Sequence, residues 1–370
     1  MRQRGTIFIV LFILIAVAIV GVSRFMGAQP PVEYTLAVDP LAQAWADSAV
    51  TAFNASQPTV NGHRISFRVV AVDDLSVWQG QNVWTTKNHQ DVWLPASHAS
   101  VDYARANGLS LVNVSDSLAR TPMVWGGYIS RANLLTSNGV VPLDWSVVQG
   151  AADKMTQSNW AALGGDSSWG YLKLGFGQVN SKISGLAALF TAAATFNKAP
   201  DLTQIPLSEQ AFRDWLSPIV KSRPSFAISG DPLLTMISGP STIELAMFPE
   251  AQWLLNIKGM NNQEEVRVNY PAYQFMLDFP LVRWQDNTTG DADRQLAVKQ
   301  LGDWLAASQQ QNNLPTYGLR PATTEPTQAN DLFRVAIQYG IAFAPDFGQA
   351  VKAPTVNEVK GLIQWVTSNR

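Results

Sequence analysis

Residues 33–54 read EYTLAVDPLAQAWADSAVTAFN, and this stretch predicts a strand followed directly by a helix. Residues 33–38 alternate as strands do, and the Asp39-Pro40 pair that follows them suits the first turn of a helix. The helix is expected to end near Asn54. Its apolar residues share one helical stripe, which would pack the helix on a sheet: Leu41, Trp45, Ala49, Ala52 and Phe53.

The same order of strand and helix recurs further along the chain. Residues 65–72 predict a strand, and residues 75–87 predict a less regular helix. Residues 91–94 predict a short buried strand, after which Ser97 caps a helix that ends near Asn107. Strands that alternate with helices indicate a mostly parallel sheet with helices on both faces.

Two long apolar stretches break this order, at residues 121–129 and 275–282, and each contains a proline. Such a pair is typical of two crossover strands between two lobes, although each stretch could also be an edge strand. We therefore expect an α/β fold of two lobes. The expected division is a signal-anchor helix and linker at 1–31, lobe one at 32–122 plus 278–370, and lobe two at 123–277.

The secondary structure expected within these lobes follows the same patterns. In lobe two, strands are expected at 172–176, 243–248 and 266–270, and helices at 183–196, 208–220 and 231–237. After residue 282 the chain is expected to return to lobe one, with helices at 291–309, 328–336 and 356–368.

The N-terminus carries an unbroken apolar run at residues 7–22, preceded by Arg2 and Arg4. A positive start before such a run orients it with its N-terminus inside the cell. The run is close to the roughly 20 residues that a spanning helix needs. We expect a single-pass anchor in the cell membrane with an extracytoplasmic domain. The alternative is cleavage near Ala28, which would leave a secreted or periplasmic protein.

Composition excludes several classes of function. The chain has 26 basic and 28 acidic residues, so nucleic acid binding is not expected. It has no cysteine, which excludes disulfides, thiolate metal sites and a lipid-modified cysteine. Most of the 13 tryptophans are expected in the core, with one or two available for a flat ligand such as a sugar ring.

The sequence contains no strong signature of an enzyme, a metal site or a cofactor. None of the three histidines has the spacing of metal ligands, and no complete glycine-rich loop for a nucleotide is present. Paired carboxylates of a glycoside hydrolase remain possible, because such a pair meets in space and not in sequence. We expect neither a metal nor a cofactor, and no catalysis.

Several segments together resemble the extracellular solute-binding proteins of ABC transporters, which have the type II periplasmic binding protein fold. Within that superfamily the chain is similar to the branch often found beside von Willebrand factor A domains. The resemblance covers residues 33–370. The segments that carry it are Asp39-Pro40-Leu41, DVWLPAS at 91–97, LGFGQVNSKISGL at 174–186, Tyr270-Pro271, DFPL at 278–281 and GLRP at 318–321.

This resemblance implies a receptor without enzymatic activity that closes two lobes on a solute and passes it to a membrane permease. The family usually has a proline and a Thr-Ser pair before the Ser-Gly of the lobe-two helix. Val179, Asn180 and Ser181 stand there in this chain. The apolar run at 7–22 would replace the tether that the lipid-modified cysteine provides in many relatives.

Ligands of parallel sheets bind where strands end and helices begin, and this rule selects the candidate residues. Free N–H groups and serine hydroxyls at such positions could hold a polar solute. Helix capping is the alternative for Ser97, Ser181, Ser184 and Glu250, strand entry for Thr121, and core packing for Tyr270. The candidate ligand-binding residues are Asp39, Pro40, Leu41, Ser97, His98, Thr121, Asn180, Ser181, Ser184, Glu250 and Tyr270.

Arg320 lies in an otherwise apolar loop, and we expect it to be buried against a carboxylate or carbonyls.

Three functions are compatible with these patterns. The first is a receptor for a small polar solute, with a sugar or another neutral compound favoured, acting as a monomer beside a permease. The second is a tethered scaffold that binds a partner, such as a von Willebrand factor A protein. The third is an exported hydrolase.

Overall fold

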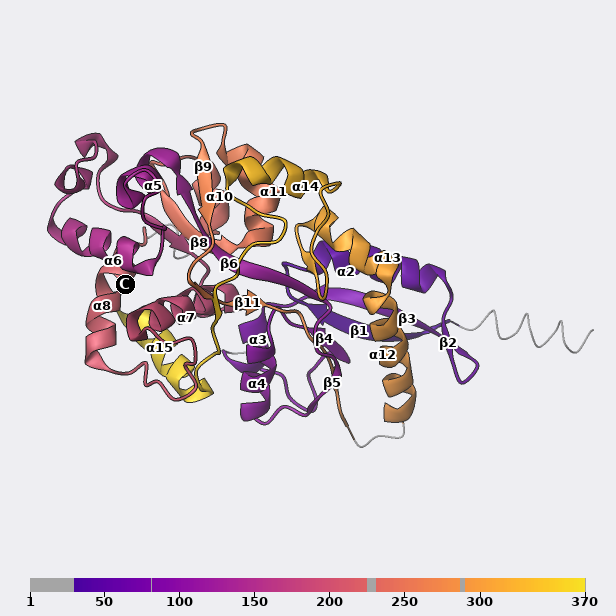
Figure 1. Cartoon of the computed structure of the whole chain (residues 1–370). Helices are drawn as coiled ribbons and strands as arrows, with labels where there is room; N and C mark the ends of the chain where they lie inside the picture. Colours follow the sequence, from indigo (N-terminus) through magenta and orange to yellow (C-terminus); the bar gives the residue numbers. More distant parts are fainter. Residues whose placement is uncertain (1–29, 81, 225–230, 287–289, 370) are drawn as a thin grey trace, which may run out of the picture.

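The computed structural model describes residues 30–80, 82–224, 231–286 and 290–369 (Figure 1). The membrane segment expected at 7–22 and the cleavage position near Ala28 lie outside these ranges. Within the described ranges, no helix combines the length and the apolar character needed to cross a bilayer.

The first sheet is built from six strands: β1 (Val32–Val38), β2 (Thr59–Val60), β3 (His63–Ala71), β4 (Val92–Leu94), β5 (Leu111–Ser115) and β12 (Leu281–Trp284). Their spatial order is β2-β3-β1-β4-β12-β5. β1 pairs in parallel with β3 and β4, as expected, while β12 runs antiparallel between β4 and β5. Val38 pairs with both Ala71 and Leu94, so three strands end together at one edge.

The second sheet is mixed, with β6 at its centre. Its strands are β6 (Ala119–Tyr128), β7 (Leu174–Phe176), β8 (Leu245–Pro249), β9 (Val266–Asn269), β11 (Met276–Leu277) and β13 (Arg320–Pro321). The order is β11-β6-β8-β7, and β9 and β13 also pair with β6. β7 and β8 are parallel, so their carboxyl ends lie together. A separate pair joins β10 (Tyr273–Gln274) to β14 (Gln349–Ala350).

The two expected crossover stretches lie side by side, where β11 pairs with β6 in the second sheet. β6 runs through the middle of the molecule in Figure 1, and β11 pairs with it at residues 121–122. From β11 the chain continues into β12 of the first sheet. These two connections join the two lobes, whose residue boundaries stay a prediction.

The helices are α2 (Gln43–Ala55), α3 (Asp74–Trp78), α4 (His98–Ala106), α5 (Ile129–Thr136), α6 (Trp145–Lys154), α7 (Ile183–Asn197), α8 (Gln210–Lys221), α10 (Pro232–Ile237), α11 (Glu250–Met260), α12 (Asp291–Ala306), α13 (Ser308–Asn313), α14 (Asp331–Ala336) and α15 (Val356–Ser368). The helix expected over 75–87 is wrong beyond Trp78. There Gln79 is extended, and Gly80 has a φ of 98°, which a helix does not permit. The helix expected near 328–336 begins at Asp331. It packs on α11, beside the second sheet.

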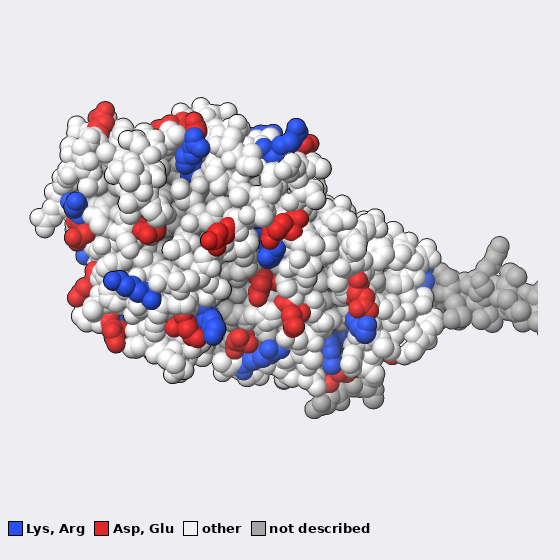
Figure 2. Space-filling view, in the orientation of Figure 1, with Lys and Arg blue, Asp and Glu red and all other residues white. Residues whose placement is uncertain are grey.

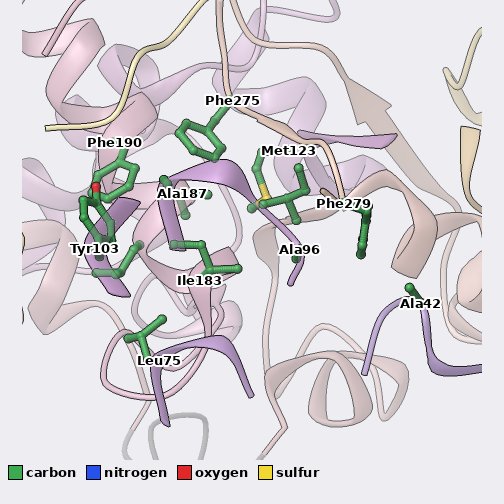
Figure 3. Packing of buried hydrophobic residues seen from close by; sticks show 14 of the residues in the cluster. Ala42, Leu75, Ala96, Tyr103, Met123, Ile183, Ala187, Phe190, Phe275 and Phe279 are labelled. Atoms are coloured by element: carbon green, nitrogen blue, oxygen red, sulfur yellow. The ribbon is translucent and has the colours of Figure 1, made fainter. Parts of the chain in front are cut away.

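A single large buried core extends from one lobe into the other, along one face of the crossover strands. Figure 3 shows Leu75 and Tyr103 of the first lobe in the same buried cluster as Ile183 and Phe190 of α7. A second cluster covers the other face of the second sheet and includes Phe333 of α14. Seven tryptophans are among the largest fully buried side chains: Trp45, Trp78, Trp93, Trp125, Trp145, Trp160 and Trp253.

Candidate functional site

A cavity of about 370 Å³ lies where strands of both sheets end. The first lobe contributes the three residues after β1, and the second lobe contributes the β7–α7 connection, the start of α10 and the β8–α11 junction. Its volume is in the range of sites for small molecules. The lining residues are Asp39, Pro40, Leu41, Gly177, Gln178, Lys182, Ser184, Asp231, Pro232, Phe248 and Gln252.

The wall from the first lobe is held in place by hydrogen bonds around Asp39. Its backbone N–H donates to the carbonyl of Leu94 over 3.0 Å, which ties the end of β1 to β4. Its carboxylate Oδ1 accepts the N–H of Leu41 over 2.9 Å, so the chain turns sharply at Pro40. Only 5% of Asp39 is exposed. The carboxylate therefore has a fixed position at the edge of the cavity.

A second buried carboxyl group, that of Asp74 at the start of α3, lies behind Asp39. Its Oδ2 accepts the backbone N–H of Ala96 over 3.0 Å and the hydroxyl of Ser100 over 2.7 Å. The two carboxyl groups also share a hydrogen bond with each other. Burial raises the pKa of Asp39 from 3.8 to about 6, and burial together with the charge of Asp39 raises the pKa of Asp74 well above its usual range.

The opposite wall depends on a close approach between the β7–α7 connection and the first turn of α7. A Cβ atom on Gly185 would lie 2.4 Å from the carbonyl oxygen of Gly177, so no larger residue fits there without movement of the backbone. Ser184, one residue earlier, is buried and lines the cavity. The glycines thus bring the start of α7 against the loop that forms this wall.

An ion pair joins the two walls beside the cavity. Lys182 of the second lobe donates from Nζ to Oδ1 of Asp73 in the first lobe, over 2.7 Å. Burial alone would lower the pKa of Lys182, but the hydrogen bond to Asp73 and nearby carboxylates outweigh burial and raise it. The ammonium group is therefore charged and held by Asp73.

Four of the candidate residues lie together at this cavity, namely Asp39, Pro40, Leu41 and Ser184. Lys182, the residue after the candidate Ser181, lines it as well. The candidates did not include the other seven lining residues, which are Gly177, Gln178, Lys182, Asp231, Pro232, Phe248 and Gln252. One signal was available, because Asp231-Pro232 opens a helix in the same way as Asp39-Pro40, with the Asp231 carboxylate accepting the N–H of Leu233 over 2.9 Å.

Three other candidates make hydrogen bonds with described groups of the protein. Ser97 caps α4, where its hydroxyl accepts the N–H of Ala99 over 3.2 Å. His98 is paired through Nδ1 with the Asp278 carboxylate at 2.7 Å. Thr121 is buried and accepts the N–H of Ala251 over 3.0 Å.

The two remaining loop candidates sit just before α7. Ser181 donates to the side-chain oxygen of Gln178 over 3.2 Å. Asn180 borders a different, open depression that Trp78 and Lys360 also line. Neither residue is among those that line the cavity between the lobes.

Glu250 and Tyr270 belong to a buried polar cluster centred on Arg320. The Arg320 guanidinium donates to both oxygens of Glu250, over 2.6 Å and 2.8 Å, and the Tyr270 hydroxyl donates to the same carboxylate. The side chains of Arg320 and Glu250 are both completely buried. The expectation that Arg320 is buried against a carboxylate and carbonyls is confirmed. Glu250 thus has an internal partner for its charge.

The described residues offer no cluster of three or more His, Cys, Asp or Glu side chains that could hold a metal ion. Acidic and basic side chains are interspersed over the face of the molecule shown in Figure 2.

Comparisons with known proteins give matches among solved structures alone. No family model and no curated protein matches the sequence. The structure is similar to the periplasmic binding protein AfuA from Actinobacillus pleuropneumoniae with fructose-6-phosphate bound, at 13% identity and a TM-score of 0.57, over 91% of this chain and 98% of that one. It is also similar to a periplasmic thiamin binding protein, at 13% identity and a TM-score of 0.57, over 92% and 96% of the two chains.

A third similar structure is the ABC substrate-binding protein Lmo0181 from Listeria monocytogenes in complex with cycloalternan. It has 11% identity and a TM-score of 0.54, over 92% of this chain and 95% of that one. These three are binding proteins, and their ligands differ widely in chemistry. At such low identity the likeness concerns the fold alone. The chain has the two-lobed, type II α/β fold of the periplasmic and ABC-transporter substrate-binding proteins.

Proposed function

We propose that the chain is an extracytoplasmic receptor that closes its two lobes on a small polar solute. The observation that carries the proposal is the cavity of about 370 Å³, whose walls come from both lobes. A site shared by two lobes that are joined through β6 and the segment at 275–282 can open and close about those connections. The three similar structures, all binding proteins, support this reading.

Delivery of the solute to an ABC-type permease is part of the proposal, as is tethering of the receptor to the cell membrane through residues 7–22. The resemblance to the branch found beside von Willebrand factor A domains makes such a protein the partner to test for a scaffold role. Cleavage near Ala28 would leave the same receptor free outside the cytoplasm.

The carboxyl pair formed by Asp39 and Asp74 does not have the geometry of a hydrolase. The carboxyl groups of glycoside hydrolases stand about 5–9.5 Å apart on either side of the bond that breaks. Asp39 and Asp74 instead share a hydrogen bond, and Asp74 is fully buried behind Asp39. Its carboxyl group therefore cannot act on a molecule in the cavity.

The test is a thermal shift screen of the purified chain against a library of polar solutes, with native mass spectrometry for any solute that is retained. At a free concentration 100 times the dissociation constant, a solute should add about 2.7 kcal/mol to the free energy of unfolding.

The variant Gln252→Trp fills the cavity from α11, and Lys258→Trp places the same side chain at an exposed site on that helix. The solute should be lost from the first variant and kept by the second. Equal binding to both variants would place the site elsewhere and refute the proposal.

A further inference from the structure

Asp39 is a buried anion whose counter-ion is not found in the described part of the chain. Its carboxylate accepts the Leu41 N–H, and no Lys, Arg or His nitrogen of the described residues lies within 4 Å of it. A buried charge is costly unless it is paired. Because Asp39 borders the cavity, a partner for its charge can enter from there.

Asp74 is not that partner, but it determines which of the two carboxyl groups carries the negative charge. Its Oδ2 is satisfied by two donors, whereas its fully buried Oδ1 meets no N–H or O–H donor among the described residues. The hydrogen bond between the two carboxyl groups lowers the pKa of Asp39 and raises that of Asp74, as expected when Asp74 carries the proton and donates it to Asp39. The pKa order agrees, since Asp74 has the more strongly raised pKa and Asp39 ionises at about 6. At neutral pH the charge is on Asp39.

The other charged groups at the cavity leave this negative charge uncompensated. Lys182 is bound to Asp73 at 2.7 Å, and its charge also acts on Asp39 and Asp231, so a single ammonium group faces three carboxylates. Asp231 adds a second carboxylate to the lining. The remaining lining residues are neutral, with amides and a hydroxyl at Gln178, Ser184 and Gln252, and apolar surface at Leu41, Phe248 and the two prolines.

We propose that the solute is a small organic cation whose positively charged nitrogen pairs with the Asp39 carboxylate in this cavity. This inference rests on the proposed function and narrows its ligand. Phe248 of β8 contributes apolar surface to the same lining, which suits the carbon skeleton of such a cation. Among the described residues no tryptophan lines the cavity, so the tryptophan content that favoured a sugar provides no stacking surface at this site.

The experiment compares three classes of probe by thermal shift and calorimetry on the purified chain. The cations are choline, putrescine and agmatine, the neutral probes are glucose and xylose, and the anions are sulfate and phosphate. At least one cation should bind. Asp39→Asn keeps the shape of the side chain and the acceptor for the Leu41 N–H. It should lower the affinity for that cation by tenfold or more. Asp47→Asn removes a charge of the same sign at an exposed site and should leave the affinity unchanged.

Affinity for the cation should also rise with pH between about 5 and 7. The cation binds the ionised form of Asp39, so protons compete with it below the pKa of about 6. The charged and titratable groups around Asp39 are Asp74, Asp73 and Lys182, together with Asp231 in the lining of the same cavity. Asp39→Asn should flatten this profile, which a purely structural role for Asp39 would not do.

The outcomes separate the inference from the function on which it rests. Binding of a neutral or anionic probe without any cation would overturn the inference and leave the receptor in place. A cation that binds wild type and Asp39→Asn equally would also overturn it. If no probe binds and native mass spectrometry finds no retained solute, both the receptor and the inference fail.

Discussion

Replacing Arg320 by methionine should destabilise the protein by about 5 kcal/mol, because this guanidinium is the centre of a fully buried polar cluster. It donates to both oxygens of Glu250, over 2.6 Å and 2.8 Å, and to the carbonyls of Ala342 and Phe343, over 2.6 Å each. These contacts connect β13 with α11 and with the chain at 342–343. The substitution removes all of them at once.

The magnitude follows from what the substitution leaves behind. Loss of one partner from a buried ion pair costs about 3–5 kcal/mol, because the other charge stays buried without compensation. Two buried carbonyls also lose a donor, which places the loss at the upper end of that range, about 5 kcal/mol. Typical domains have a free energy of unfolding of about 5–15 kcal/mol, so the variant should be close to the limit of folding.

Urea unfolding of three variants measures this effect. Arg320→Met should shift the midpoint strongly downward, and the double variant Glu250→Leu with Arg320→Met should recover part of the loss, because neither charge is then buried alone. The control is Arg334→Met, whose ion pair with Asp331 is 67% and 82% exposed and should contribute less than about 1 kcal/mol. If Arg320→Met lost no more than the control, the reasoning about the buried pair would be refuted.

Three further predictions concern the walls of the cavity and their charges. Gly185→Ala should cost about 1–3 kcal/mol in urea unfolding and weaken solute binding, because the new Cβ would meet the Gly177 carbonyl at 2.4 Å; an unchanged midpoint would contradict this. The pKa of Asp74 is raised in the folded protein, so above pH 4 the folded state holds more protons than the unfolded chain. The Asp74 carboxyl therefore costs stability as pH rises through 4 to 7. Asp74→Asn should therefore raise the free energy of unfolding at neutral pH and flatten its fall with pH, and a variant less stable at every pH would speak against it. The hydrogen bond to Asp278 raises the pKa of His98, so the pair stabilises the fold below about pH 6.5 and this stability is lost as pH rises through the folded-state pKa. An NMR titration should find that pKa lowered in Asp278→Asn, and an unshifted titration would show that the pair does not form.

Local signals in the sequence predicted the secondary structure well where capping and periodicity agree. The Ser97 cap and the helix that follows it are confirmed, and the apolar run near 183–196 forms α7. The helix expected over 75–87 failed because Gly80 takes a left-handed conformation that its position in the pattern did not reveal. Apolar periodicity alone does not show whether a glycine within the pattern is tolerated in the helix or ends it.

The candidate site was predicted only in part because its contacts join residues that are distant in the sequence. Asp39 was selected as the end of a strand, but its partner Asp74 follows a different strand, β3. Glu250 was selected for its place at the start of a helix, and the structure pairs it with Arg320 instead. The lining residues Phe248 and Gln252 stand two positions to either side of it. Sequence patterns located the edge of the sheet, whereas tertiary packing decided which side chains face the cavity.

The most direct test of the receptor is a crystal structure of the chain with a solute that raises its melting temperature. The account predicts density for one small molecule between the Asp39–Leu41 turn and the Gly177–Ser184 wall, with a positively charged nitrogen within hydrogen-bond distance of the Asp39 carboxylate. A solute found outside this cavity, while the cavity holds only water, would contradict it.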